Sequence, residues 1–175
     1  EKGEIAVLEL DSWQLQGFGE AKISPYIAVF TTFMEDHLNY YGGNMDAYLD
    51  DKANIFKYQT KDDFLIVGEQ AADIIKKKYG KSIKSKIIIA KQNDLPSKWK
   101  LKIPGEHNRY NAACALVVAK VLGIPKKIIK ETLENFKGVP GRLELIRKVN
   151  GVKIYNDTTA TTPQATIDAL KALGS

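Results

Sequence analysis

Short apolar runs, separated by glycine, proline and charged residues, recur through the first two thirds of the chain. Four of them have the length and β-prone composition of buried strands, at residues 4–10, 27–30, 64–67 and 87–89. Helical periodicity lies between them, over residues 45–58 and 69–78. This alternation predicts an α/β fold with a mostly parallel sheet flanked by helices. The alternating charges of residues 99–103 predict a further strand at an edge or on the surface.

The last third of the chain predicts two helices, a linker and a hairpin in place of alternating strands and helices. In residues 103–121, a loop ending in Gly105 leads into a segment that is apolar on nearly every side and predicts a buried helix, and a second helix follows over 125–136. The Gly- and Pro-rich segment KGVPGRLE then predicts an interdomain linker, so that residues 1–139 and 140–175 belong to different domains. Beyond it, Asn150-Gly151 predicts a tight hairpin between residues 143–149 and 152–155, and a helix should run from Pro163 to Leu173.

Lys52 is the anomaly in this pattern. In the helix predicted after the N-cap Asn44, one apolar stripe contains Met45, Tyr48, Leu49 and Phe56, and Lys52 falls within it. Lysine is seldom buried unless it is paired. One interpretation is that the alkyl stem covers the stripe while the ammonium reaches water. The other is that Lys52 reaches into a polar site shared with His37, which follows the strand at 27–30.

Composition narrows the classes of function. The 175 residues are 44% hydrophobic and 27% charged, as in ordinary globular proteins, and no run approaches the roughly 18 apolar residues of a membrane span. The net charge of +5 suits anionic ligands, but no aromatic residues interleave with the lysine clusters, so we expect no nucleic-acid partner. A single cysteine, Cys114, excludes an internal disulfide and fits a reducing cytoplasm. The chain opens without an initiator methionine, which favours a piece of a longer protein.

Two further groups of polar residues mark candidate sites. Glu9 and Asp11 stand at the end of the first predicted strand, where carboxylates either meet a cation or cap the following turn. Asn108 and Asn111 lie in the first turns of the predicted buried helix, where they either cap it or meet an anion. Gly80-Lys81-Ser82 is not a phosphate-binding loop, because the required preceding glycine is absent and the segment follows a helix.

Four segments together resemble the Mur ligases, the ATP-dependent amide ligases of peptidoglycan synthesis. They are EDHLNYYGGNMDAYLDDKANIF, GEHNRYNAACA, KGVPGRLE and NDTTAT, in the family's order. Within the family the chain looks most like the members that add glutamate to UDP-N-acetylmuramoyl-L-alanine. The resemblance implies the second half of a central, P-loop-type ATP-binding domain, followed by the first hairpin and helix of a Rossmann-like domain that binds the amino acid.

The resemblance also implies roles for individual residues. Glu9, His37 and a carbamylated Lys52 would serve Mg²⁺, with His37 and Lys52 acting in catalysis. ATP would be held by Asn108, Asn111 at the adenine, Arg142 at the phosphates, Asp157 at the ribose, and Thr161. The substrates would meet Gln14, Asp11, which stands where the family commonly has serine, and Thr159, which stands where many members have a substrate-contacting lysine.

The activity implied is ATP-dependent formation of an amide through an acyl phosphate, by a monomeric cytoplasmic enzyme with no membrane partner. The family's phosphate loop would lie upstream of Glu1, so we expect these 175 residues alone to be inactive. Two alternatives stay open. One is a sister ligase such as a folylpolyglutamate synthase, and the other is a non-catalytic nucleotide-binding fragment.

Overall fold

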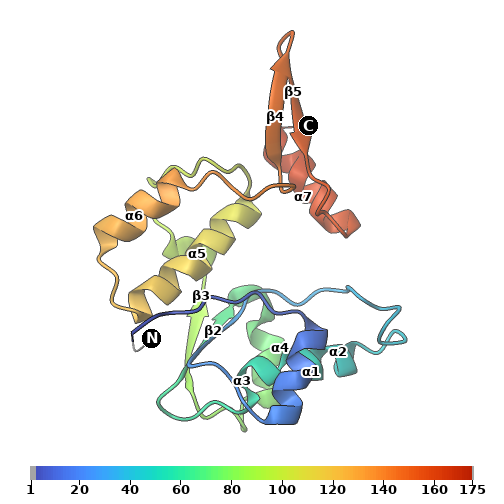
Figure 1. The fold of residues 1–175 in the computed structure, drawn as a ribbon, viewed down its shortest axis with the longest axis vertical. Helices are drawn as coiled ribbons and strands as arrows, with labels where there is room; N and C mark the ends of the chain where they lie inside the picture. Colours follow the sequence, from blue (N-terminus) through green and yellow to red (C-terminus); the bar gives the residue numbers. More distant parts are fainter. Residues whose placement is uncertain (1–2, 175) are drawn as a thin grey trace. The chain divides into compact units, whose positions relative to one another are not determined.

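The computed structural model describes residues 3–174, which divide into two compact units, up to Ile89 and from Ala90 onward. Figure 1 shows their helices and strands. Each unit is described by itself. No helix among residues 3–174 is long and apolar enough to cross a bilayer.

A three-stranded sheet, in the order β1-β2-β3, organises the first unit. Strand β1 (Ile27–Phe30) pairs in parallel with β2 (Phe64–Gly68), with Ile27 opposite Phe64 and Phe30 opposite Val67. Strand β3 (Lys86–Ala90) lies on the other side of β2. The central strand β2 is buried along almost its whole length, as a strand covered on both faces should be. The predicted strands at 27–30, 64–67 and 87–89 are confirmed.

Four helices accompany this sheet (Figure 1). They are α1 (Ser12–Ala21), α2 (Met45–Lys52), α3 (Asn54–Lys57) and α4 (Glu69–Tyr79). The cap at Asn44 is confirmed, because its side chain accepts a hydrogen bond from the backbone N–H of Ala47. The prediction of a single helix over 45–58 is wrong in detail, because Ala53 separates α2 from α3. Both helices nevertheless contribute buried apolar side chains, such as Leu49 and Phe56.

The core of the first unit lies where α2, α3 and α4 meet β1 and β2. Leu49 and Phe56 from the helices join Phe30, Leu65 and other buried side chains in one cluster. Helix α1 packs beside α2 and α3, and the contact is close at Gly19. A Cβ at position 19 would lie 2.5 Å from Asn54 Nδ2, an atom that donates to the carbonyl of Leu15. Glycine is therefore needed there for the helices to approach.

The strand predicted over residues 4–10 is wrong. This segment has no regular secondary structure and joins neither sheet of the described residues, and Ile5, Val7 and Leu8 are more than half exposed. Its apolar composition is that of a strand, but a strand exists only when a neighbouring backbone pairs with it. Composition alone therefore could not decide this element.

The second unit begins with a 3₁₀ turn at Gln92–Asp94 and two helices, α5 (Glu106–Val121) and α6 (Lys126–Asn135). Its core contains Leu95, Trp99, Leu116 and Ile129. Both predicted helices are confirmed, although α5 buries one side and leaves Asn111 and Ala115 exposed.

The strand predicted over 99–103 is wrong. Trp99 is 2% exposed and serves the core, not a sheet edge. Its carbonyl accepts a hydrogen bond from Arg109 Nη1 at 3.1 Å, and the carbonyl of Pro96 accepts from Arg109 Nη2 at 3.3 Å. A guanidinium group on α5 thus satisfies backbone groups that a sheet would otherwise have paired.

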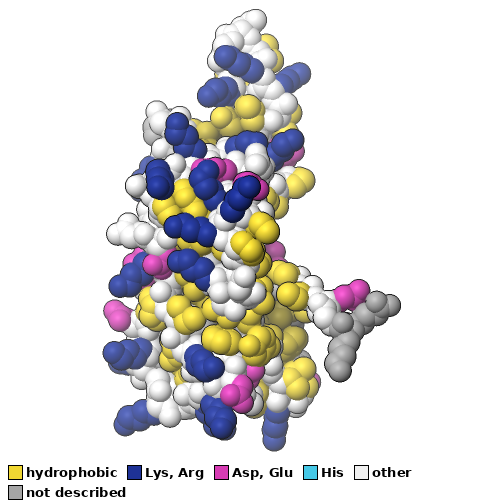
Figure 2. Space-filling model, turned by 90° about the vertical axis from the view of Figure 1, so that its left-hand side faces the viewer, with side chains coloured by type: hydrophobic (Ala, Val, Ile, Leu, Met, Phe, Trp, Pro, Cys, Tyr) yellow, Lys and Arg dark blue, Asp and Glu magenta, His cyan; other side chains and the backbone are white. Residues whose placement is uncertain are grey.

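A hairpin and a helix complete the second unit. Strands β4 (Glu144–Val149) and β5 (Val152–Asn156) are antiparallel, and α7 runs from Pro163 to Leu173 behind the cap Thr162. Asn150 and Gly151 both have positive φ, at 49° and 87°, which confirms the predicted type I′ turn. The apolar side chains of β4, β5 and α7 remain largely exposed, since one hairpin and one helix bury too little to form a core. Figure 2 shows apolar side chains among lysines and arginines on the visible surface.

The first prediction concerns Gln59, whose buried side chain links three parts of the first unit. Its Nε2 donates to the carbonyls of Pro25 and Phe64 at 2.9 and 2.8 Å, and its Oε1 accepts from Ser85 Oγ at 2.8 Å. Gln59→Leu should lower the free energy of unfolding by about 2 kcal/mol, because it leaves buried polar groups unpaired. Ser85→Ala, which removes one bond, should cost less. Urea denaturation of both variants tests this, and a loss below about 0.5 kcal/mol for Gln59→Leu would contradict it.

Candidate functional site

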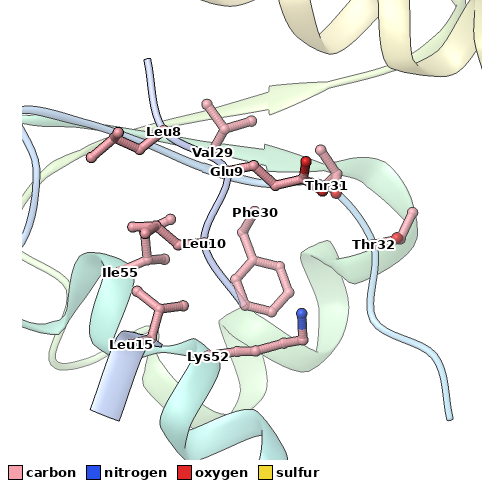
Figure 3. A pocket seen from close by; sticks show the side chains of 10 residues that line it. All are labelled: Leu8, Glu9, Leu10, Leu15, Val29, Phe30, Thr31, Thr32, Lys52 and Ile55. Carbon is pink, nitrogen blue, oxygen red and sulfur yellow. The ribbon is translucent and has the colours of Figure 1, made fainter. Parts of the chain in front are cut away.

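A cavity of about 300 Å³ opens at the carboxyl end of β1. Its polar lining comes from Glu9, Thr31, Thr32 and Lys52. Apolar residues complete the wall: Leu8, Leu10, Leu15, Val29, Phe30 and Ile55. Figure 3 shows the Lys52 side chain rising from α2 beside Phe30 and the Glu9 side chain extending toward Thr31. The cavity therefore lies where ligands of parallel α/β sheets usually bind.

Lys52 brings a cationic group to the apolar wall of this cavity. Its Nζ lies 5.1 Å from the centre of the Tyr48 ring, within the range of a cation–π interaction. Burial lowers the pKa of the Lys52 ammonium from its ordinary value of 10.5, while the charges of Asp36 and Asp11 oppose the shift. The Lys52 side chain therefore lines the cavity together with Glu9, Thr31 and Thr32.

His37 contacts the same Tyr48 ring as Lys52. The rings of His37 and Tyr48 are 6.0 Å apart, and Trp13 packs on His37 at 4.5 Å. The Nε2 atom of His37 is 3.6 Å from a carboxylate oxygen of Asp36. The φ of His37, 54°, is unusual for a residue other than glycine. Burial, followed by the charge of Asp36, raises the pKa of Tyr48 to about 12, so this shared ring stays neutral. His37 does not line the cavity itself.

Of the three residues predicted to serve a metal, Glu9 and Lys52 line the cavity, and His37 contacts Tyr48, which packs beneath Lys52 Nζ. Among residues 3–174, no three His, Cys, Asp or Glu side chains are grouped so that they could hold a metal ion. Mg²⁺ prefers oxygen ligands, and the cavity offers the Glu9 carboxylate and the hydroxyls of Thr31 and Thr32. An ammonium group repels a cation, so the charged form of Lys52 opposes a magnesium ion at this lining.

Asp11 and Gln14 cap the start of helix α1. Asp11 Oδ1 accepts from the backbone N–H of Gln14 at 2.8 Å, and Gln14 Oε1 accepts from the backbone N–H of Asp11 at 2.9 Å. Together they form a capping box that starts α1. The aspartate thus performs the capping that a serine would perform at this position.

The two asparagines near the start of α5 have different surroundings. Asn108 Nδ2 donates to the carbonyl of Pro104 at 2.6 Å, so this side chain fixes the loop before the helix. Asn111 is exposed one turn later. Gly105, with a φ of 100°, precedes the helix and leaves its first N–H groups without a side-chain cap. These N–H groups could meet an anion or a nucleotide.

Arg142, Asp157 and Thr159 form a second polar group, between the linker and the loop after β5. Arg142 is exposed. Asp157 Oδ1 accepts from the backbone N–H of Leu143 at 3.0 Å, and Thr159 Oγ1 donates to the carbonyl of Gly141 at 2.7 Å. Thr161 is exposed immediately before the cap of α7. The structure thus brings together three residues that are up to 17 positions apart in the printed sequence.

Gly80-Lys81-Ser82 follows α4, and Gly80 caps that helix in the right-handed conformation. A Cβ at position 80 would lie 2.5 Å from the carbonyl oxygen of Lys76. The prediction that Gly80 caps this helix is confirmed; a phosphate-binding loop connects a strand to a helix.

Three residues of the cavity region were missed by the sequence patterns. Thr31 and Thr32 line the cavity directly after β1, and Tyr48 contacts both Lys52 and His37. The rule that ligands meet the carboxyl ends of strands could have found the two threonines. No local signal distinguishes Tyr48 from an ordinary core aromatic.

Sequence comparison identifies the class of protein to which this parallel α/β fold and these sites belong. Residues 1–119 match the family described as the Mur ligase middle domain. A UDP-N-acetylmuramoylalanine--D-glutamate ligase of Aquifex aeolicus is 38% identical over 176 residues, which cover 95% of this chain and 41% of that protein. The Bacillus cereus (strain AH187) ligase of the same name is 34% identical over 188 residues, covering 98% of this chain and 41% of its own length. The chain belongs to the Mur ligase family.

Solved structures support the same fold. MurF of Thermotoga maritima, in complex with ADP, matches with a TM-score of 0.70 at 20% identity, over 94% of this chain and 42% of that one. MurF of Acinetobacter baumannii gives 0.70 at 22% identity, over 89% and 39%. A folylpolyglutamate synthase (FPGS) of L. casei gives 0.64 at 21%, over 86% and 42%. The chain thus spans about two fifths of the length of these relatives.

The second prediction follows from the buried charge of Lys52. Because the pKa of Lys52 is lowered in the folded protein, the unfolded chain binds more protons between that lowered pKa and the ordinary value of 10.5. The contribution of Lys52 to stability therefore rises with pH through this window. Lys52→Met should therefore be more stable than the wild type at pH 7, because it removes a charge that burial disfavours. The difference should shrink as the pH rises toward 10.5.

Urea denaturation between pH 7 and 10, in buffer with a chelator, measures the effect. Lys76→Met, on the exposed side of α4, is the matched control and should change stability little. A Lys52→Met protein that is less stable at pH 7, or a difference that does not depend on pH, would contradict the prediction.

Proposed function

We propose that the complete protein is an ATP-dependent ligase that adds glutamate to UDP-N-acetylmuramoyl-L-alanine. The names of the curated relatives support this reaction, at 34–38% identity over nearly the whole chain. The single structural observation that carries the proposal is the placement of Lys52 and Glu9 on one cavity at the end of β1. A lysine kept on an apolar wall against its desolvation cost is typical of a functional site.

The proposed reaction has two chemical steps. A carboxylate oxygen of the UDP-sugar substrate attacks the γ-phosphorus of ATP, forming an acyl phosphate and releasing ADP. The amine of glutamate then attacks the acyl carbon, loses a proton and displaces inorganic phosphate, forming the amide. Charge accumulates on the transferring phosphoryl group, and bound Mg²⁺ supplies electrostatic stabilisation of that charge.

Residues of this chain would hold the reactants. Asn111, exposed at the start of α5, would contact the adenine, and Asp157 the ribose. The exposed guanidinium of Arg142 would reach the phosphates, for which its fork of donors is suited. Asn108, through its bond to the carbonyl of Pro104, would fix the loop before α5. Thr161 would complete this group.

Lys52 would act as a carbamate. Its neutral amine attacks carbon dioxide, forming an N–C bond and releasing one proton, so that a cation becomes an anion. Burial favours the neutral amine from which this reaction starts. With Glu9 and the threonine hydroxyls of the cavity, the carbamate would provide the oxygen ligands that magnesium prefers, and His37 would approach from beside Tyr48.

Partners and location follow from this assignment. The substrates would be ATP, glutamate and the UDP-sugar, without nucleic acid or membrane, and the enzyme would act as a cytoplasmic monomer. Cys114 is the single cysteine of the sequence and is buried, which fits a reducing compartment. A folylpolyglutamate synthase is less well supported, because its likeness is one of fold at 21% identity.

The third prediction tests Lys52 in the complete ligase. Lys52→Ala should reduce glutamate-dependent phosphate release by at least about 100-fold, the scale of removing one electrostatic stabiliser. Lys52→Glu should retain part of the activity, because it restores a carboxylate near the same place. Crystallographic density of the magnesium-bound enzyme should show three additional atoms beyond Nζ. Full activity of Lys52→Ala would exclude the proposed role.

The fourth prediction concerns the 175 residues alone. We infer that they do not hydrolyse ATP, because their Gly-Lys-Ser segment caps a helix and does not form a phosphate-binding loop. A phosphate-release assay with ATP, Mg²⁺, glutamate and the UDP-sugar should give the background rate. The complete ligase, assayed in parallel, is the positive control. Substrate-dependent release from the 175-residue chain would refute the inference.

A further inference from the structure

The backbone that carries Arg142 is tied to the loop after β5 on both sides of that arginine. On one side, the carbonyl of Gly141 accepts two hydrogen bonds from Thr159, one from Oγ1 at 2.7 Å and one from the backbone N–H at 3.1 Å. On the other side, the N–H of Leu143 donates to Asp157 Oδ1 at 3.0 Å. Arg142 itself is thus the middle residue of a three-residue segment that is held at both ends.

Further contacts fix the conformation of this segment. The N–H of Gly141 donates to Glu144 Oε2 at 2.8 Å, and the same oxygen accepts from Asn156 Nδ2 at 3.2 Å. Gly141 and Leu143 both have positive φ, 77° and 45°. A positive φ is costly for leucine, so the surrounding hydrogen bonds must maintain it.

Thr159 lies very close to this turn. A Cβ at position 141 would lie 3.0 Å from Thr159 Cγ2, a tight contact, and the φ of 77° would strain any other residue there. The hydroxyl proton of Thr159 is used in the bond to Gly141. A hydroxyl has only one proton to donate, so in this conformation Thr159 has none left for the carboxylate of an amino-acid substrate.

We propose that Thr159 is a positioning residue for Arg142 and not a ligand of the amino-acid substrate. The inference rests on the proposed function in one respect, that Arg142 meets the phosphates of ATP. By holding Gly141, Thr159 fixes the backbone from which the exposed guanidinium extends. A backbone that is already ordered loses less conformational entropy when the side chain engages a phosphate.

The experiment compares three variants of the complete ligase. Thr159→Val keeps the shape and removes the hydroxyl, and Thr159→Ser restores it. Thr158→Val is the matched control: it makes the same change one residue earlier, at an exposed side chain whose hydroxyl also lies close to Gly141. The measured quantities are kcat and the KM values for ATP and for glutamate.

Thr159→Val should raise the KM for ATP about fivefold, the scale of losing one hydrogen bond, and leave the KM for glutamate unchanged. Thr159→Ser and Thr158→Val should resemble the wild type. The proposal is overturned if Thr159→Val raises the KM for glutamate and not that for ATP, or if Thr158→Val has the same effect as Thr159→Val.

Amide hydrogen exchange provides a readout that does not need activity. In Thr159→Val, the N–H groups of Gly141, Leu143 and Thr159 should exchange faster than in the wild type, whereas Thr158→Val should leave them unchanged. Unchanged exchange in Thr159→Val overturns the proposal. A wild-type enzyme without glutamate-dependent phosphate release would instead refute the proposed function, and exchange would still decide whether Thr159 holds the Arg142 turn.

Discussion

The packing of α2 and α3 against β1 and β2 is the constraint on which the cavity depends. Leu49 and Phe56 are almost completely buried with Phe30 and Leu65 in one cluster. Lys52 lies between these two helical anchors, so its position relative to the end of β1 cannot change unless the core opens. Close-packed interiors resist such shifts. Burial of the apolar side chains Leu49 and Phe56 therefore fixes the position of Lys52 relative to the end of β1.

The same packing imposes a cost at Lys52 that the surroundings only partly offset. Desolvation disfavours its ammonium, while Asp36, Asp11 and the face of Tyr48 favour it. Natural proteins keep such destabilising groups where activity requires them. Tyr48 connects this lysine with His37, so two residues that are 15 positions apart in the printed sequence share one aromatic ring.

In the second unit, polar side chains fix irregular backbone. Arg109 satisfies the carbonyls of Pro96 and Trp99, and Asp157 and Thr159 hold the turn that carries Arg142. Buried or half-buried backbone groups outside helices and sheets need such partners. Residues that a sequence motif predicts to bind a ligand can therefore form hydrogen bonds with the protein backbone. Asp11 and Gln14 do so in the capping box of α1.

The sequence by itself determined the α/β class, most strands and helices, the type I′ turn at Asn150-Gly151 and the unusual position of Lys52. These features depend on local periodicity, on caps and on the φ values that glycine and asparagine tolerate. Only the tertiary structure decided that residues 4–10 form no strand, that Trp99 belongs to a core, and that Tyr48 and Thr159 contact candidate site residues. The physical reason is that pairing and side-chain contacts depend on partners distant in sequence, about which local composition carries no information.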